Sequence, residues 1–118
     1  MSKKARIANI WKVNTYYLNG QDKTTSYRSL VTREKLVMYQ SGLFEYTEVS
    51  SWTWAVPSYS GTWKFINDKE DIEMVSDNAK IGTQIYRITR LKNRQLWMKI
   101  QLTPDSLIEY HYIPYTEE

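Results

Sequence analysis

The chain has 118 residues, which is enough for a single domain whose core needs no disulfide or metal to hold it together. Its formal net charge is +3, and its lysines and arginines are spread along the sequence, so nothing favours a nucleic-acid-binding protein. The absence of cysteine excludes disulfides, thiol chemistry and cysteine-based zinc sites, and no run approaches the roughly 20 apolar residues of a membrane-spanning helix.

Most of the chain alternates between apolar and polar residues. This two-residue period is typical of half-buried antiparallel strands, and polar turns separate the runs. The expected strands cover residues 7–18, 35–39, 43–49, 62–66, 71–75, 85–90, 95–102 and 107–112.

The first third of the chain carries the least regular pattern. Residues 1–6 are basic and polar, and we expect them to be disordered. In the first strand, one face is expected to carry Trp11, Val13, Thr15 and Tyr17. Residues 23–34 show no sustained period, so they form the longest expected connection, with one short helical turn near residues 28–34.

The middle of the chain contains a tight hairpin and a tryptophan pair. Gly42 can take the positive φ that a short turn demands, and Phe44 follows it on the same face as Tyr46. Trp52 and Trp54 are two residues apart, so they lie on one side if that segment is extended.

Consecutive antiparallel strands must protect their two outer edges, and closure into an up-and-down barrel removes both. We therefore predict an all-β fold, with residues 1–118 forming one domain and eight antiparallel strands closing into a barrel. An open sandwich is the alternative. A barrel of about eight strands is just wide enough to be filled by side chains or to hold one small ligand.

Several segments resemble a known family. The chain is similar to the small lipocalin-like domains common in Bacteroidota. The segments that carry the likeness are Ile10-Trp11-Lys12-Val13, Gly61-Thr62-Trp63-Lys64, Tyr86-Arg87-Ile88-Thr89-Arg90-Leu91, Gln95-Leu96-Trp97-Met98-Lys99-Ile100 and Glu109-Tyr110-His111-Tyr112. Two features depart from the family: Asn9 stands where lipocalins have the glycine of G-x-W, and residues 107–114 contain no arginine to pack over that tryptophan.

The resemblance implies a calycin-like barrel that binds a small apolar molecule without catalysis or a cofactor. It also implies attachment to the cell envelope as a lipoprotein. If the chain is full-length as given, a cytoplasmic location is expected instead. We expect a monomer that has no nucleic-acid partner.

Bulky side chains fall on the strand faces that we expect to point inward. They could line a cavity for an apolar or aromatic ligand, with tyrosine hydroxyls orienting it, or they could simply fill the barrel. These candidate ligand-binding residues are Trp63, Phe65, Met74, Tyr86, Ile88, Met98, Tyr110 and Tyr112.

A second group could form the barrel mouth or an interaction surface. Trp52 and Trp54 are expected there, together with Arg87 and Arg90 of a basic hairpin. The alternative function is therefore a protein-interaction or scaffold domain with a packed barrel. Ordinary packing of the tryptophans, and basic residues that merely protect strand edges, would explain the same pattern.

Nothing in the sequence favours an enzyme or a metal site. His111 is the single histidine, and we expect it to face away from Tyr110 and Tyr112, without a neighbouring nucleophile or metal-ligand spacing. Glu45 and Glu48 show no spacing suited to acid–base catalysis, so we interpret them as solvated.

Overall fold

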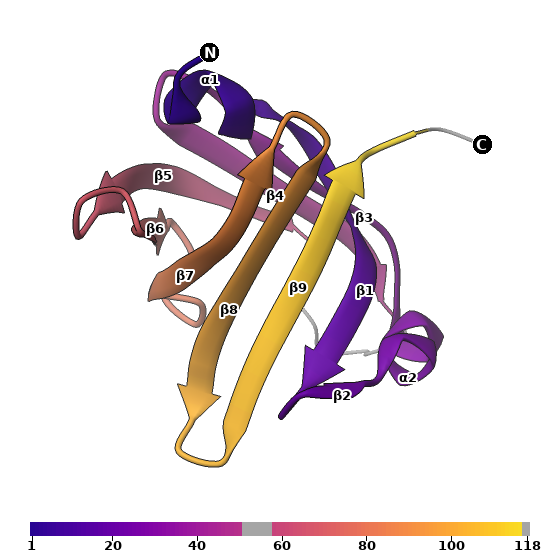
Figure 1. The fold of residues 1–118 in the computed structure, drawn as a ribbon. Helices are drawn as coiled ribbons and strands as arrows, with labels where there is room; N and C mark the ends of the chain where they lie inside the picture. Colours follow the sequence, from indigo (N-terminus) through magenta and orange to yellow (C-terminus); the bar gives the residue numbers. More distant parts are fainter. Residues whose placement is uncertain (51–57, 117–118) are drawn as a thin grey trace.

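In the computed structural model, which describes residues 1–50 and 58–116, one antiparallel sheet closes on itself (Figure 1). Its order is β2-β1-β3-β4-β5-β6-β7-β8-β9, and β1 also pairs with β9. The long strands are β1 (Asn9–Leu18), β3 (Val31–Met38), β4 (Leu43–Ser50), β5 (Ser58–Ile66), β6 (Asp71–Ser76), β7 (Thr83–Lys92), β8 (Gln95–Thr103) and β9 (Ser106–Pro114). The short β2 (Gln21–Asp22) pairs with the end of β1.

The predicted all-β barrel is thereby confirmed. All pairings are antiparallel, and each barrel strand pairs with the next in sequence, apart from the added β2. The strands are mostly longer than the alternation indicates, and β5 begins at Ser58 instead of residue 62. Trp52 and Trp54 lie outside the described residues.

The described residues contain two short helices. The first, α1 (Lys3–Ile7), occupies the segment that the sequence suggested was disordered. Its N-cap is Ser2, whose side chain accepts a hydrogen bond from the Ala5 N–H, and the helix ends at the fully buried Ile7. An N-cap hydrogen bond and one buried apolar side chain stabilise an otherwise marginal helix.

The second helix, α2 (Thr24–Leu30), begins earlier than the helical turn expected near residues 28–34. That expectation was wrong for residues 31–34, because β3 already begins at Val31. Asp22 fixes the start of α2, since its carboxylate accepts hydrogen bonds from both the N–H and the hydroxyl of Thr24. Neither helix found in residues 1–50 and 58–116 has both the length and the apolar character that crossing a bilayer requires.

A β-bulge in β1 changes which side chains face the interior. Val13 pairs with Tyr112 and Thr15 pairs with His111, so Asn14 has no opposite residue. Beyond this extra residue the faces exchange, as they do at any bulge. Trp11 and Val13 are buried as predicted, but Tyr16 packs against the core in place of Tyr17.

One end of the barrel is closed by packed side chains. Trp11 is fully buried there, and its indole Nε1 donates to the Ile7 carbonyl over 2.9 Å. The indole of Trp63 donates to the Tyr39 carbonyl over 2.9 Å. Both indole donors are therefore satisfied, as buried polar groups must be. Figure 1 shows α1 at this end and α2 at the opposite end.

Candidate functional site

The barrel is not solid, because its half nearer α2 contains a cavity of about 430 Å³. This volume falls within the range of roughly 300–1,000 Å³ that is typical of small-molecule pockets. Among the described residues, the apolar part of the lining includes Val13, Val31, Leu36, Phe44, Met74, Ile81 and Met98. The polar residues found there, apart from tyrosines, are Glu48, Ser76, Lys80 and Gln84.

Tyrosine is the main residue type of the lining. Among the described residues, Tyr27, Tyr46, Tyr59, Tyr86, Tyr110 and Tyr112 line the cavity. The rings of Tyr46 and Tyr59 lie 5.0 Å apart between centroids, and those of Tyr110 and Tyr112 lie 5.6 Å apart. Tyr27 comes from α2 and stacks on Tyr16 at 4.7 Å, so the helix contributes a ring to the barrel interior. Such rigid rings give a ligand a large contact area, and their hydroxyls supply hydrogen bonds.

Burial keeps these hydroxyls protonated. It raises the pKa of Tyr59 to about 12, with the Glu48 carboxylate adding to the effect. Burial is also the main cause that raises the pKa of Tyr27, Tyr46 and Tyr86 above the ordinary value of 10.0. The interior therefore presents neutral O–H groups at any physiological pH.

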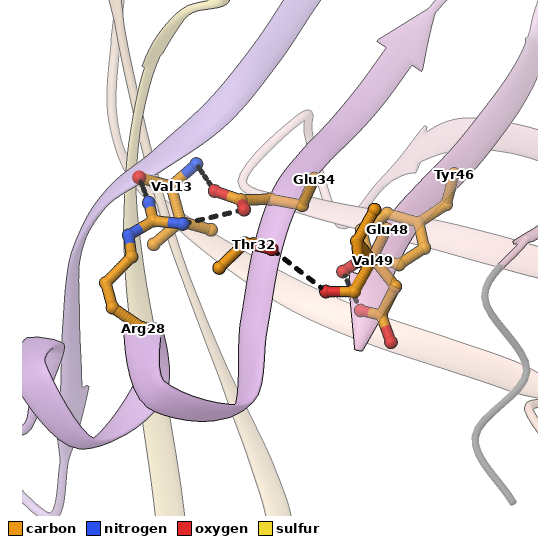
Figure 2. Close-up of polar contacts among 7 residues, drawn as sticks. All are labelled: Val13, Arg28, Thr32, Glu34, Tyr46, Glu48 and Val49. Atoms are coloured by element: carbon orange, nitrogen blue, oxygen red, sulfur yellow. Dashed lines mark hydrogen bonds and ion pairs between the residues drawn. The ribbon is translucent and has the colours of Figure 1, made fainter. Parts of the chain in front are cut away.

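A carboxylate stands among these rings. Glu48 lies on β4, two residues after Tyr46, and it lines the cavity. The Tyr46 hydroxyl donates to Glu48 Oε2 over 2.6 Å, as Figure 2 shows. Glu48 is half-buried, so it is only partly solvated, and the sequence interpretation did not place it in the lining. The signal was present in the sequence, because residues 44, 46 and 48 share one face of a strand.

An acidic side chain of β3 is fully buried where β1 and β3 separate. Glu34 is 2% exposed; its Oε1 accepts from the Val13 N–H over 2.9 Å, and its Oε2 lies 2.7 Å from Arg28 Nη1. Arg28 also donates to the Val13 carbonyl (Figure 2). β1 pairs with β3 only from Asn9 to Trp11, so these side chains replace the backbone ladder beyond that point. They also fix α2, and with it Tyr27, against the barrel.

The structure divides the predicted interior residues into two groups. Met74, Tyr86, Met98, Tyr110 and Tyr112 line the cavity. Trp63, Phe65 and Ile88 belong to the core but not to the lining. Sequence reasoning missed the lining residues Tyr27, Tyr46, Tyr59 and Glu48, of which Tyr46 and Glu48 follow from the alternation of β4.

The two arginines predicted for the barrel mouth or an interaction surface contact side chains of neighbouring strands. Arg87 Nε donates to Asp71 Oδ1 over 2.5 Å, and the Arg90 guanidinium lies 5.1 Å from the centre of the Trp97 ring. Neither arginine lines the cavity. The Asn67 amide, and after it Arg87, lowers the pKa of Asp71 below its ordinary value.

His111 lies on the outer face of β9. It stacks on Trp97 with ring centres 3.9 Å apart, and its Nε2 lies 2.5 Å from Glu109 Oε2. Within residues 1–50 and 58–116, no three histidine or acidic side chains gather closely enough to hold a metal ion.

Comparison with known proteins gives a match in structure alone. No protein-family model matches the chain, and no curated protein matches it. The crystal structure of a lipocalin-like protein from Bacteroides uniformis superposes with a TM-score of 0.62, at 10% sequence identity, over 93% of this chain and 99% of that one. The likeness to lipocalin-like domains expected from the sequence is thus confirmed at the level of the fold: the chain adopts the fold of a lipocalin-like protein.

Proposed function

We propose that this protein binds a small apolar or aromatic molecule inside its barrel and does not catalyse a reaction. The observation that carries the proposal is the cavity of about 430 Å³, which apolar and aromatic side chains of the barrel line. Well-packed interiors rarely leave a space of this size without a use.

The lining supports a ligand with an apolar body and few polar atoms. Met74 and Met98 give adaptable apolar contacts, and the tyrosines give flat faces for an aromatic ring or an alkyl chain. The Tyr86 hydroxyl donates a hydrogen bond to Gln84 Oε1 over 2.9 Å. These two polar groups can also form hydrogen bonds with a polar atom of the ligand and so orient it. The fold of the Bacteroides uniformis protein is consistent with such a role.

Calorimetric titration with 2-phenylethanol, indole and 1-octanol tests the proposal. We expect at least one of them to bind with a Kd between micromolar and millimolar values, as suits ligands of this size. The Gln84→Trp variant should abolish that binding, because Gln84 lines the cavity. Ile85→Trp is the matched control, since the neighbouring Ile85 is 48% exposed on the other face of β7.

Absence of heat with all three compounds would refute the proposal. Equal binding by the wild type and Gln84→Trp would refute it as well, because the ligand would then sit outside the barrel.

Attachment to the cell envelope is part of the same proposal, supported by the family resemblance seen in the sequence. Fractionation of the source cells, followed by immunodetection, tests it. We expect the protein in the membrane and periplasmic fractions, and recovery in the cytosol alone would contradict this part.

A further inference from the structure

We propose that the natural ligand carries a positive charge: it is a small amine whose ammonium group binds Glu48 while its apolar body fills the cavity. This inference rests on the proposed function, and it names the chemical class of the ligand.

The position of Glu48 is the first argument. Phe44, Tyr46 and Glu48 alternate along β4 toward the interior, whereas Val49 is 52% exposed on the other face. A carboxylate on the interior face of a barrel loses part of its hydration, which costs free energy unless a partner replaces the water. We therefore expect the Glu48 carboxylate to interact with a group that replaces this water.

The second argument comes from the comparison of Glu48 with Glu34. Glu34 is fully provided with partners, because Arg28 and the Val13 N–H contact both of its oxygens. Glu48 accepts one hydrogen bond, from Tyr46, and forms no ion pair within the described residues. An ionised carboxylate offers about four acceptor positions, so Glu48 keeps capacity for a donor that enters the cavity.

The aromatic surroundings of Glu48 are the third argument. The Tyr46 hydroxyl donates to the carboxylate, and Tyr27 lines the same cavity. Tyr59 packs its ring against that of Tyr46. The faces of aromatic rings attract cations, and they do so more strongly where water is excluded. A carboxylate beside several rings is therefore suited to an organic ammonium group.

Among the described lining residues, Lys80 carries the charge opposite to that of Glu48. Lys80 is exposed in the connection between β6 and β7, and it forms no ion pair with Glu48. It would instead favour an anionic ligand. The experiment must therefore distinguish an amine from a carboxylate as well as from a neutral molecule.

Three probes with the same phenyl group make this comparison: 2-phenylethylamine, 2-phenylethanol and 3-phenylpropanoate. We expect the wild type to bind the amine at least about tenfold more tightly than the alcohol, as a charge-assisted contact in a sheltered site provides. The carboxylate should bind most weakly. This comparison needs no variant, so it does not depend on the folding of a mutant.

Two variants then assign the preference to Glu48. Glu48→Gln should lower the affinity for the amine about tenfold and change that for the alcohol less than about twofold. Glu45→Gln is the matched control: Glu45 is exposed on the other face of β4, and it too accepts a tyrosine hydroxyl, that of Tyr39 at 2.8 Å. It should change neither affinity.

The outcomes separate this inference from the proposed function. If the alcohol binds and the amine has no advantage, or if the carboxylate binds most tightly, the inference is wrong while the cavity remains a binding site. A preference for the amine that persists in Glu48→Gln also overturns it. If none of the three probes binds, the inference fails, and the titrations with indole and 1-octanol then decide whether the proposed function fails as well.

Discussion

Glu34 Oε2 lies 2.7 Å from Arg28 Nη1, in an ion pair that is buried on one side only. The Glu34 side chain is 2% exposed and that of Arg28 is 35% exposed. The pair joins α2 to the barrel wall at the place where β1 and β3 no longer share backbone hydrogen bonds. Because Tyr27 precedes Arg28 in α2, the same ion pair positions one ring of the cavity lining.

The Arg28→Met variant keeps the apolar part of the side chain but removes the guanidinium group. The Glu34 carboxylate then stays buried without its cation. We expect the free energy of unfolding to fall by about 2–3 kcal/mol, somewhat below the range for removing one partner of a fully buried pair, because Arg28 is partly exposed. Urea denaturation measures this. The control is Lys64→Met, since Lys64 is 69% exposed and 3.7 Å from Glu73; it should cost less than about 1 kcal/mol. Equal effects of the two variants would show that the Arg28–Glu34 pair has no special role.

At Gly61 the strands β5 and β6 lie so close together that there is no room for a side chain. A Cβ atom there would lie 1.9 Å from the Val75 carbonyl oxygen and 3.0 Å from the Phe44 ring. The backbone of β6 would have to move, so we expect Gly61→Ala to destabilise the protein by about 2–3 kcal/mol. Thr62→Ala, at the exposed neighbouring position, should have a much smaller effect. Thermal unfolding of both variants checks this, and an unchanged Tm for Gly61→Ala would contradict it.

Asp71 should make the stability depend on pH at the acidic end. Hydrogen bonds from Asn67 and Arg87 lower its pKa in the folded state. A lowered pKa contributes stability that is present above the unfolded value, near pH 4, and is lost as the pH falls through the folded value. The wild type should therefore lose its advantage over Asp71→Asn as the pH falls below about 4. Unfolding free energies measured across this range test the prediction, and parallel profiles would disprove it.

The buried tyrosines should make the stability of the protein fall as the pH rises above about 10. Burial raises the pKa of Tyr59 to about 12, so the unfolded chain loses its tyrosine protons first. The stability due to these groups is complete below about pH 10 and is lost as the pH rises toward 12. Phenolate absorbance of the folded protein should therefore lag behind that of the urea-unfolded chain. Coincident titration curves, with the fold still intact by circular dichroism, would rule this out.

The sequence predicts the barrel well because strand alternation and the need to protect sheet edges are local and general rules. Met98, Met74 and Tyr112 could be assigned to the interior because each lies in a regular strand with clear alternation. Glu48 could have been assigned in the same way, but a charged residue suggests solvent.

The remaining features depend on contacts that sequence patterns do not reveal. The bulge at Asn14 turns Tyr16 inward, and no local signal marks it. The place of Tyr27 in the cavity depends on the ion pair between Arg28 and Glu34, which belong to different elements. The cavity itself is the space that remains after all side chains have packed, so its volume follows only from the three-dimensional structure.

The most direct test of a ligand within the barrel uses the methyl groups of the four methionines. Met74 and Met98 line the cavity, Met38 is buried outside it, and Met1 is 81% exposed. In methyl NMR spectra of the protein titrated with 2-phenylethanol and 2-phenylethylamine, we expect the signals of Met74 and Met98 to shift and to show contacts to the phenyl protons, while those of Met38 and Met1 stay in place. Shifts confined to Met1, or the absence of any shift at saturating probe, would contradict a binding site inside the barrel.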